Sequence, residues 1–191
     1  LLVWKMTTSL RPGKVFFDIG ANVGFFTLLG SRIVGEAGAV GAFEPLPENL
    51  GALKVHVRLN GARNVNVVAA AVSDRAGRER FGPVDNPAMG GLAPEGSIEV
   101  VTVALADLVR EGAVRRPDVL KIDVEGAELR VLAGARRTLE EARPAIVLSA
   151  HGWQLFDTCR DLLRQVGYEV HLAKDGPDDG DYLLVARSAE R

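Results

Sequence analysis

The sequence predicts an α/β fold: a mostly parallel seven-stranded sheet with helices on both faces and a C-terminal antiparallel hairpin. Short apolar, β-branched runs alternate with longer runs of helical periodicity, a pattern typical of parallel sheets. The last two apolar runs, YEVHLA and DYLLVAR, are separated only by the short turn KDGPDDGD, which suits an antiparallel pair.

The positions of the helices and strands are predicted from this alternation and from the Gly and Pro residues that separate the runs. The helix at 47–61, for example, has Pro47 at its start and Gly61 at its end. Strands of the sheet are expected at 14–20, 39–45, 64–74, 117–124, 144–152, 168–173 and 181–187, with further extended pieces at 77–83 and 98–103. Helices are expected at 25–35, 47–61, 105–111, 125–142 and 153–167.

The segment from Pro83 to Gly96 has no periodicity and is rich in Gly, Pro, Ala, Asn and Met. We expect a loop there, either a lid over a binding site or a poorly ordered insertion. Met89 would supply an apolar contact in the first case.

Bulk properties narrow the class of protein. The 191 residues suit one domain, 1–191, and the formal net charge of -2 offers no basic excess for nucleic acid. No apolar run approaches the ~18 residues of a membrane span. The single cysteine, Cys159, cannot form an internal disulfide, and no signal peptide is recognisable, so a cytoplasmic protein is expected. Nothing in the sequence indicates an oligomeric state.

The first strand runs into a glycine turn that begins at Gly20. In open α/β sheets this turn is the usual place for a nucleotide-like ligand. The dinucleotide fingerprint is G-x-G-x-x-G, but Asn22 stands at its second glycine and Phe25 at its third. A side chain at Asn22 disfavours a pyrophosphate. An NAD-binding oxidoreductase is therefore the weaker alternative.

Two acids frame the same turn. The carboxylate of Asp18 would repel phosphate and favour a cationic ligand, such as a sulfonium. Glu44 ends the second strand 24 residues after Gly20 (44 minus 20), near the spacing of an acid that binds ribose hydroxyls. Alternatively, Asp18 is a helix cap and Glu44 a solvated strand end. Together they indicate a cationic, adenosine-bearing cofactor without phosphates, which describes S-adenosylmethionine.

Four segments, FFDIGANVGFFTLL, AFEPLPEN, NVNVVAAAVSD and VLKIDVEGAELRVLAGA, occur in this order and closely resemble the FkbM-like methyltransferases. The resemblance extends from about Pro12 to His151. It implies a Rossmann-like methyltransferase fold, S-adenosylmethionine as methyl donor, and O-methylation of a small-molecule or glycan acceptor. It also implies a donor site formed by Asp18, Gly20, Ala21, Asn22, Gly24, Thr27, Glu44, Val72, Ser73, Asp74 and Asp123, with Glu44 on the ribose and 72–74 by the adenine.

Two departures from the family pattern concern the acceptor side. The family commonly has a Leu-Asp-Asp-like segment before the fourth strand, where this chain has VALADLV and keeps only Asp107. The family also tends to have an acid and a histidine after the fifth strand, where this chain has VLSAHG and keeps only His151. A cofactor-binding module without turnover is therefore an alternative.

The segment KIDVEGAE places Lys121, Asp123, Glu125 and Glu128 within eight residues. Strand alternation puts Lys121 and Asp123 on one side, with Asp123 at the carboxyl end beside the cofactor. We expect both to be catalytic, although a mutual ion pair that fixes the strand end would also explain them. His151 ends the next strand, and an unperturbed pKa of ~6.5 would suit a general base. Capping of the following helix is the alternative.

A metal-assisted mechanism is a further alternative, in which Asp123, Glu125 and His151 would contribute ligands. No spacing in the sequence requires a metal, so we expect none. Trp153 is either an aromatic wall for a ring-like acceptor or a helix-packing residue.

Overall fold

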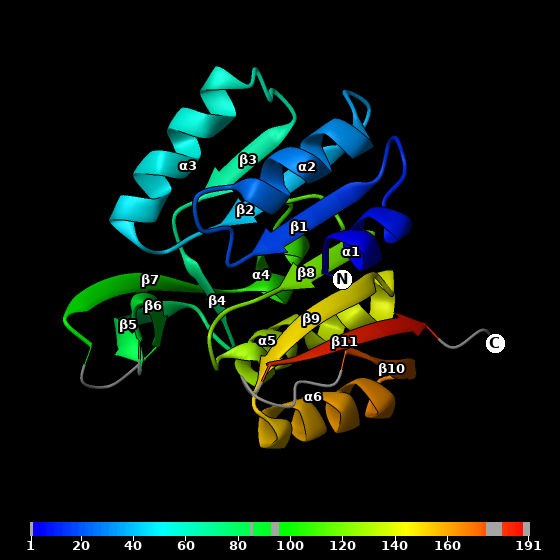
Figure 1. Cartoon of the computed structure of the whole chain (residues 1–191). Coiled ribbons are helices and arrows are strands. Elements are labelled where there is room, and N and C mark those ends of the chain that lie inside the picture. Colours follow the sequence, from blue (N-terminus) through cyan, green and yellow to red (C-terminus); the bar gives the residue numbers. More distant parts are fainter. Residues whose placement is uncertain (1, 85, 93–95, 175–180, 189–191) are drawn as a thin grey trace.

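A computed structural model describes residues 2–84, 86–92, 96–174 and 181–188. Its larger sheet has seven strands in the order β10-β11-β9-β8-β1-β2-β3 (Figure 1). The five strands from β9 to β3 are mutually parallel, and β11 is antiparallel to both of its neighbours. The predicted fold class and C-terminal hairpin are thus confirmed. The strands are β1 (Val15–Ile19), β2 (Ala39–Phe43), β3 (Val65–Val68), β8 (Val119–Ile122), β9 (Ala145–His151), β10 (Tyr168–Lys174) and β11 (Asp181–Ser188).

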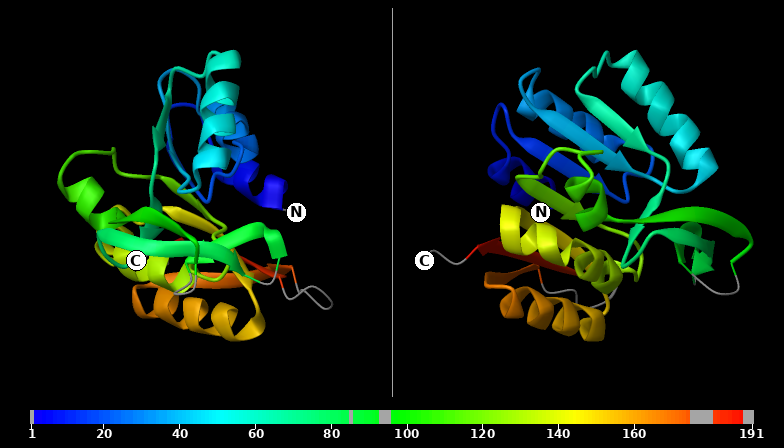
Figure 2. Two further views of the ribbon diagram at one scale, coloured as in Figure 1. Left: turned by 90° about the vertical axis from the view of Figure 1, so that its left-hand side faces the viewer. Right: turned by 180° about the vertical axis from the view of Figure 1, so that it is seen from behind.

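Helices cover both faces of this sheet, as predicted (Figure 2). Successive phenylalanines of β1 point to opposite faces: Phe16 packs in a cluster with Met6 and Val34, whereas Phe17 packs in a cluster with Leu132. One face carries α1 (Leu2–Ser9), α2 (Phe25–Val34) and α3 (Pro47–Leu59). The other carries α4 (Leu105–Arg110), α5 (Glu128–Ala142) and α6 (Trp153–Gln165).

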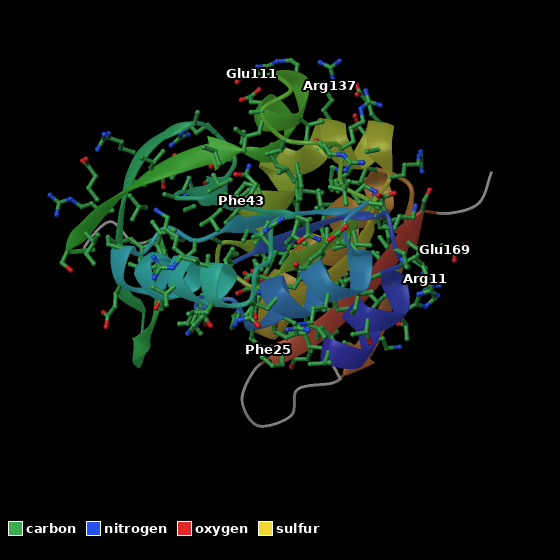
Figure 3. All side chains as sticks on the ribbon, turned by 90° about the horizontal axis from the view of Figure 1, so that it is seen from above. Arg11, Phe25, Phe43, Glu111, Arg137 and Glu169 are labelled. Atoms are coloured by element: carbon green, nitrogen blue, oxygen red, sulfur yellow. The ribbon has the colours of Figure 1, made fainter. Side chains whose placement is uncertain are left out.

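The interior is mostly apolar and the periphery is charged. Phe43 lies inside, edge-on to Phe17 with ring centroids 5.5 Å apart, while Arg11, Glu111 and Arg137 lie on the outside (Figure 3). None of the described helices is long and apolar enough to cross a membrane.

The prediction of a single third strand at 64–74 is wrong. The structure divides it into β3, which pairs with β2, and β4 (Ala71–Ser73), which pairs with β7 (Ile98–Ala104) in a second sheet. The second sheet has the order β4-β7-β5-β6. The chain turns at Ala70, whose N–H bonds the carbonyl of Val68. The run AAA carries no turn residue, so this break could not be predicted from the sequence.

The prediction of a loop at 83–96 is also wrong for the residues of this segment that the structure describes. β5 (Gly77–Val84) and β6 (Asn86–Leu92) form an antiparallel hairpin, and β5 also pairs with β7. Gly and Pro weaken strand propensity, but backbone pairing to β7 outweighs it. The contact suggested for Met89 lies outside the described side chains. The helix α1 was not expected, and burial of Met6 against Phe16 explains its position.

The second sheet is tied to α5 by Arg130. Its guanidinium donates to Asp74 Oδ1 at 2.7 and 2.9 Å and to Glu79 Oε2 at 2.7 Å. Gly134 of the same helix also lies against β4, where an added Cβ would stand 1.9 Å from the Ser73 carbonyl oxygen. These contacts fix β4 relative to the larger sheet.

We predict that Arg130→Gln lowers the free energy of unfolding by about 1 kcal/mol, because it removes a paired guanidinium from two carboxylates. Arg137→Gln is the control: Arg137 pairs with Glu141 on an exposed helix face, and its loss should leave the free energy of unfolding close to that of wild type. Urea denaturation measures both values.

The Arg130 effect should depend on pH. Its hydrogen bonds lower the pKa of both Asp74 and Glu79. Depressed carboxyl pKa values stabilise the fold above about pH 5, and this contribution is lost as pH falls through the depressed values. A difference between wild type and Arg130→Gln that grows on acidification would contradict the assignment.

Candidate functional site

A cavity of about 390 Å³ opens at the carboxyl ends of β1, β2 and β8. This is the edge of an open α/β sheet at which ligands bind. Polar groups of the first turn and of the β8 loop face apolar side chains from α2 and the second sheet. The lining includes Gly20, Ala21, Asn22, Phe25, Phe26, Phe43, Glu44, Asn49, Val72, Phe81, Lys121, Asp123 and Glu125.

The first turn is sterically specified. Gly20 has φ +77°, and a Cβ there would lie 1.9 Å from the carbonyl oxygen of Asp123. Only glycine allows the β1 and β8 ends to approach this closely. Asn22 also has a left-handed φ of 50°, a conformation that Asn tolerates better than most residues.

Every backbone N–H from Gly20 to Gly24 is used within the protein. The N–H groups of Gly20 and Ala21 bond the Phe43 carbonyl, at 3.1 and 2.9 Å. Asn22 N–H donates to Glu44 Oε2 at 2.9 Å, and Val23 N–H donates to the Asn22 side chain at 2.7 Å. Gly24 N–H bonds the Ala21 carbonyl at 2.9 Å. These five amides are therefore not free to bind a phosphate group.

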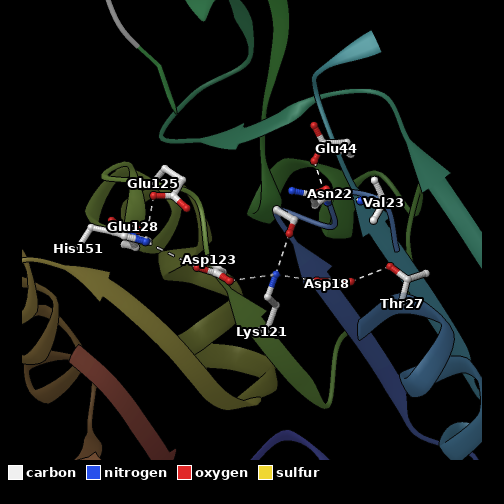
Figure 4. A network of polar contacts seen from close by, with 11 residues as sticks. Asp18, Asn22, Val23, Thr27, Glu44, Lys121, Asp123, Glu125, Glu128 and His151 are labelled. Atoms are coloured by element: carbon white, nitrogen blue, oxygen red, sulfur yellow. Dashed lines mark hydrogen bonds and ion pairs between the residues drawn. The ribbon is translucent and has the colours of Figure 1, made fainter. Parts of the chain in front are cut away.

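The Glu44 carboxylate is held rigidly at the cavity wall (Figure 4). In addition to the Asn22 bond, its Oε1 accepts the Leu46 N–H at 2.9 Å. Its exposed fraction is 4%, and burial raises its pKa against the opposing effect of these hydrogen bonds. The Asn49 side chain also hydrogen-bonds this carboxylate, so one of its roughly four acceptor sites is left for a ligand hydroxyl.

Asp18 lies behind the cavity rather than in it. Its exposed fraction is 0%; Thr27 Oγ1 donates to Oδ2 at 2.6 Å, and Lys121 Nζ lies 3.0 Å from Oδ1. β1 and β8 are paired in a register that sets Asp18 directly beside Lys121. The expectation that the Asp18 charge faces a cationic ligand is therefore corrected: Lys121 neutralises it.

Lys121 also donates to the Gly20 carbonyl at 2.7 Å and lies 3.7 Å from Asp123 Oδ2. The expected ion pair between Lys121 and Asp123 is present, but Asp18 is the nearer partner. With an exposed fraction of 2%, Lys121 acts on the turn through the Gly20 carbonyl. Lys121 also lines the cavity, and its expected catalytic role stays a prediction.

His151 is surrounded by carboxylates (Figure 4). Nδ1 lies 2.6 Å from Glu128 Oε1, and Nε2 lies 3.1 Å from Glu125 Oε2 and 3.8 Å from Asp123 Oδ1. Burial would lower the pKa of His151, but the Glu128 hydrogen bond and the three acidic charges raise it to about 9. The environment therefore departs from the unperturbed pKa that the sequence suggested for a general base, and the catalytic role of His151 stays a prediction.

The same contacts gather three metal-ligating groups. One ligand atom each from Asp123, Glu125 and His151 lies within 4.8 Å of the others. Asp123 and Glu125 also line the cavity, so the cluster adjoins it directly. Burial raises the pKa of Asp123 although Lys121 and His151 oppose the shift. The sequence indicated these three residues only as an alternative.

The other predicted residues divide into two groups. Gly20, Ala21, Asn22, Glu44, Val72 and Asp123 contribute to the cavity wall, whereas Asp18, Gly24, Thr27, Ser73 and Asp74 are not among the lining residues. Sequence reasoning missed Phe25, Phe43, Asn49 and Phe81. An exposed fraction of 63% for Phe25, at the start of an otherwise well-packed helix, marks it as a site residue, but the sequence alone shows no such signal.

The seven-stranded topology with a cavity at this edge defines a Rossmann-like methyltransferase fold. The chain belongs to the FkbM methyltransferase family, since residues 18–170 match the methyltransferase FkbM domain. The family resemblance predicted from the four sequence segments is thus confirmed.

Two curated relatives are similar in sequence. The chain is 35% identical over 162 residues to 31-O-demethyl-FK506 methyltransferase FkbM of Streptomyces tacrolimicus, covering 66% of this chain and 61% of that protein. It is 33% identical over 176 residues to hexuronic acid methyltransferase AglP of Haloferax volcanii, covering 91% and 70%. The chain thus spans only about three-fifths of the first of these relatives.

Two solved structures share the fold. A methyltransferase FkbM from Methylobacillus flagellatus has a TM-score of 0.63 at 23% identity, covering 94% of this chain and 48% of that one. Aeropyrum pernix fibrillarin, solved with natively bound S-adenosyl-L-methionine, has a TM-score of 0.64 at 17% identity, covering 94% and 68%.

We predict that Lys121→Met lowers the free energy of unfolding by about 3–5 kcal/mol, because it leaves the Asp18 carboxylate buried without its cation. Asp18→Asn combined with Lys121→Met should recover most of this loss, because the remaining amide carries no charge. Chemical denaturation of both variants checks the pair. Equal losses in the single and double variants would show that the charge of Asp18 is not what Lys121 compensates.

Proposed function

We propose that the protein is an S-adenosylmethionine-dependent O-methyltransferase that methylates a hydroxyl of a small molecule or sugar. The observation that carries the proposal is the hydrogen bonding of the first turn. All backbone N–H groups from Gly20 to Gly24 are already paired, and Glu44 stands at the same wall. This wall suits a nucleoside without phosphates.

Glu44 is the group that would recognise the nucleoside. Two backbone amides orient its carboxylate, so little side-chain entropy is lost when ribose hydroxyls donate to it. A pyrophosphate would meet this carboxylate at close range and find no amide donors in the turn. The same contacts disfavour the NAD-binding oxidoreductase that the sequence left as the weaker alternative.

The acceptor class is proposed from the relatives. One relative is named for methylation of 31-O-demethyl-FK506 and another for methylation of a hexuronic acid. The cavity lining includes the exposed ring of Phe25, which offers an apolar surface, and the acidic side chains of Asp123 and Glu125. A ring with one apolar face and several hydroxyls fits these walls.

Methyl transfer requires few chemical groups from the protein. The acceptor oxygen attacks the methyl carbon, the O–C bond forms as the C–S bond breaks, and the electron pair stays on sulfur in S-adenosylhomocysteine. Alignment of the two reactants supplies much of the acceleration. In this chain the Gly20 turn and Glu44 would fix the donor, and the β8 loop would fix the acceptor.

We predict that Glu44→Gln weakens S-adenosylhomocysteine binding about 10- to 150-fold, equivalent to ~1.5–3 kcal/mol for hydrogen bonds to a charged group. Glu48→Gln, on an exposed position of α3, is the matched control and should bind as wild type does. Isothermal titration calorimetry gives both affinities.

An analogue of S-adenosylhomocysteine that lacks the ribose hydroxyls separates recognition from folding. Wild type should bind this analogue weakly, whereas Glu44→Gln should no longer distinguish it from the parent compound. Undiminished discrimination in Glu44→Gln would remove the ribose assignment.

Methyl-labelled S-adenosylmethionine tests the acceptor class. Incubation with a panel of uronic acid glycosides and macrocyclic alcohols should yield a labelled methyl ether in at least one pool. Label found only in RNA added in parallel would contradict a hydroxyl acceptor of the small-molecule or sugar class.

A further inference from the structure

We propose that Asp123, Glu125 and His151 form a divalent cation site at the acceptor side of the donor cavity. The three side chains come from the end of β8, the loop that follows it, and the end of β9 (Figure 4). The catalytic role of this cation rests on the proposed function, whereas its binding does not.

The spacing of the donor atoms suits a single ion. The three atoms lie within 4.8 Å of one another, and Nε2 of His151 is 3.1 Å from Glu125 Oε2. Opposite ligands of one octahedral ion are separated by about 4 Å, twice a metal–oxygen bond of ~2.1 Å. Small side-chain shifts are enough to reach this geometry.

Glu128, which is not one of the three proposed ligands, orients the His151 imidazole toward Asp123 and Glu125. Glu128 Oε1 lies 2.6 Å from His151 Nδ1, and the Glu128 side chain has an exposed fraction of 0%. A buried carboxylate on the far ring nitrogen is the arrangement that orients metal-binding histidines in proteins. It leaves Nε2 directed toward Asp123 and Glu125. Glu128 is therefore a positioning residue for the site.

A second observation is electrostatic. The second oxygen of Glu128, Oε2, is buried and has no hydrogen-bond partner among the described residues. Three carboxylates thus converge on one imidazole, and the ammonium that reaches Asp123, that of Lys121, lies closer to Asp18. Partly buried carboxylates are costly unless a cation compensates them, and a divalent ion supplies that charge.

The donor set indicates the class of metal. Two carboxylates and one imidazole suit Mn²⁺ or Mg²⁺ with water in the remaining positions, and three ligands leave half of an octahedral shell open. Because Asp123 and Glu125 line the cavity, the open positions face it.

In the proposed reaction the acceptor hydroxyl would occupy one open position. Coordination lowers the pKa of the hydroxyl, whose proton passes to solvent water. The resulting alkoxide oxygen forms the new bond to the methyl carbon as the C–S bond breaks. Only a neutral imidazole binds a metal, so the cation would displace the Nε2 proton of His151, and that proton would pass to solvent water.

Mn²⁺ binding to the metal-free protein tests the proposal without substrate or donor. Electron paramagnetic resonance should show one bound Mn²⁺ per chain with a dissociation constant below about 1 mM. His151→Gln should weaken binding at least tenfold, and Glu128→Gln by about 10- to 100-fold through loss of orientation. Glu140→Gln, on an exposed position of the same helix α5, is the matched control and should leave the affinity unchanged.

S-adenosylhomocysteine binding, measured in a chelator, reports on the donor site separately. Retained donor binding with no Mn²⁺ binding would overturn the cation site and leave the proposed function intact. Equal Mn²⁺ affinity in wild type, His151→Gln and Glu125→Gln would place any bound ion elsewhere and would also overturn the proposal. If His151→Gln does not fold, Glu125→Gln, in which the exchanged side chain is 28% exposed, serves as the ligand variant.

Discussion

The buried ion pair between Asp18 and Lys121 is the interaction on which the site depends. It joins β1 to β8 at the level where both strands end, and the same ammonium holds the Gly20 carbonyl. Gly20 is thereby pressed against the Asp123 backbone, a contact that admits no Cβ. The turn on one strand and the acidic loop on the next are thus fixed as a single unit.

This unit divides the site into two regions of different character. On the β1 and β2 side the backbone amides are satisfied internally, and Glu44 is the group that projects an acceptor toward a ligand. On the β8 and β9 side the carboxylates gather around His151. A neutral nucleoside moiety suits the first region, and cations suit the second. A sulfonium methyl donor lying between them would place its charge toward the acidic side.

The larger sheet was predictable because most of its strands are short, largely apolar runs with Gly or Pro on at least one side. The division of residues 64–74 into two strands was not predictable, because Ala69 to Ala71 contain no turn signal. What distinguishes the two strands is their pairing: β3 pairs with β2, and β4 pairs with β7. The hairpin of β5 and β6 has too many Gly and Pro residues to be recognised without its pairing to β7.

Part of the donor wall was also predictable. The spacing from the glycine turn identified Glu44 and Asn22. Spacing along the chain does not show depth, so Asp18 was expected to face the ligand although Lys121 covers it. The environment of His151 depends on Glu125 and Glu128, more than twenty residues away in sequence but adjacent in space. The adjacency of the two strands was expected, but the side-chain contacts of Glu125 and Glu128 that raise the pKa of His151 are not specified by adjacency alone.

The most direct test of the central claim is a calorimetric titration of the wild-type chain with S-adenosylhomocysteine and, in parallel, with NAD. A turn with no unused amides beside the Glu44 carboxylate should bind S-adenosylhomocysteine at micromolar concentration and should not bind NAD. Binding of NAD without S-adenosylhomocysteine would mean that the turn rearranges to accept a pyrophosphate, and the donor assignment would be contradicted.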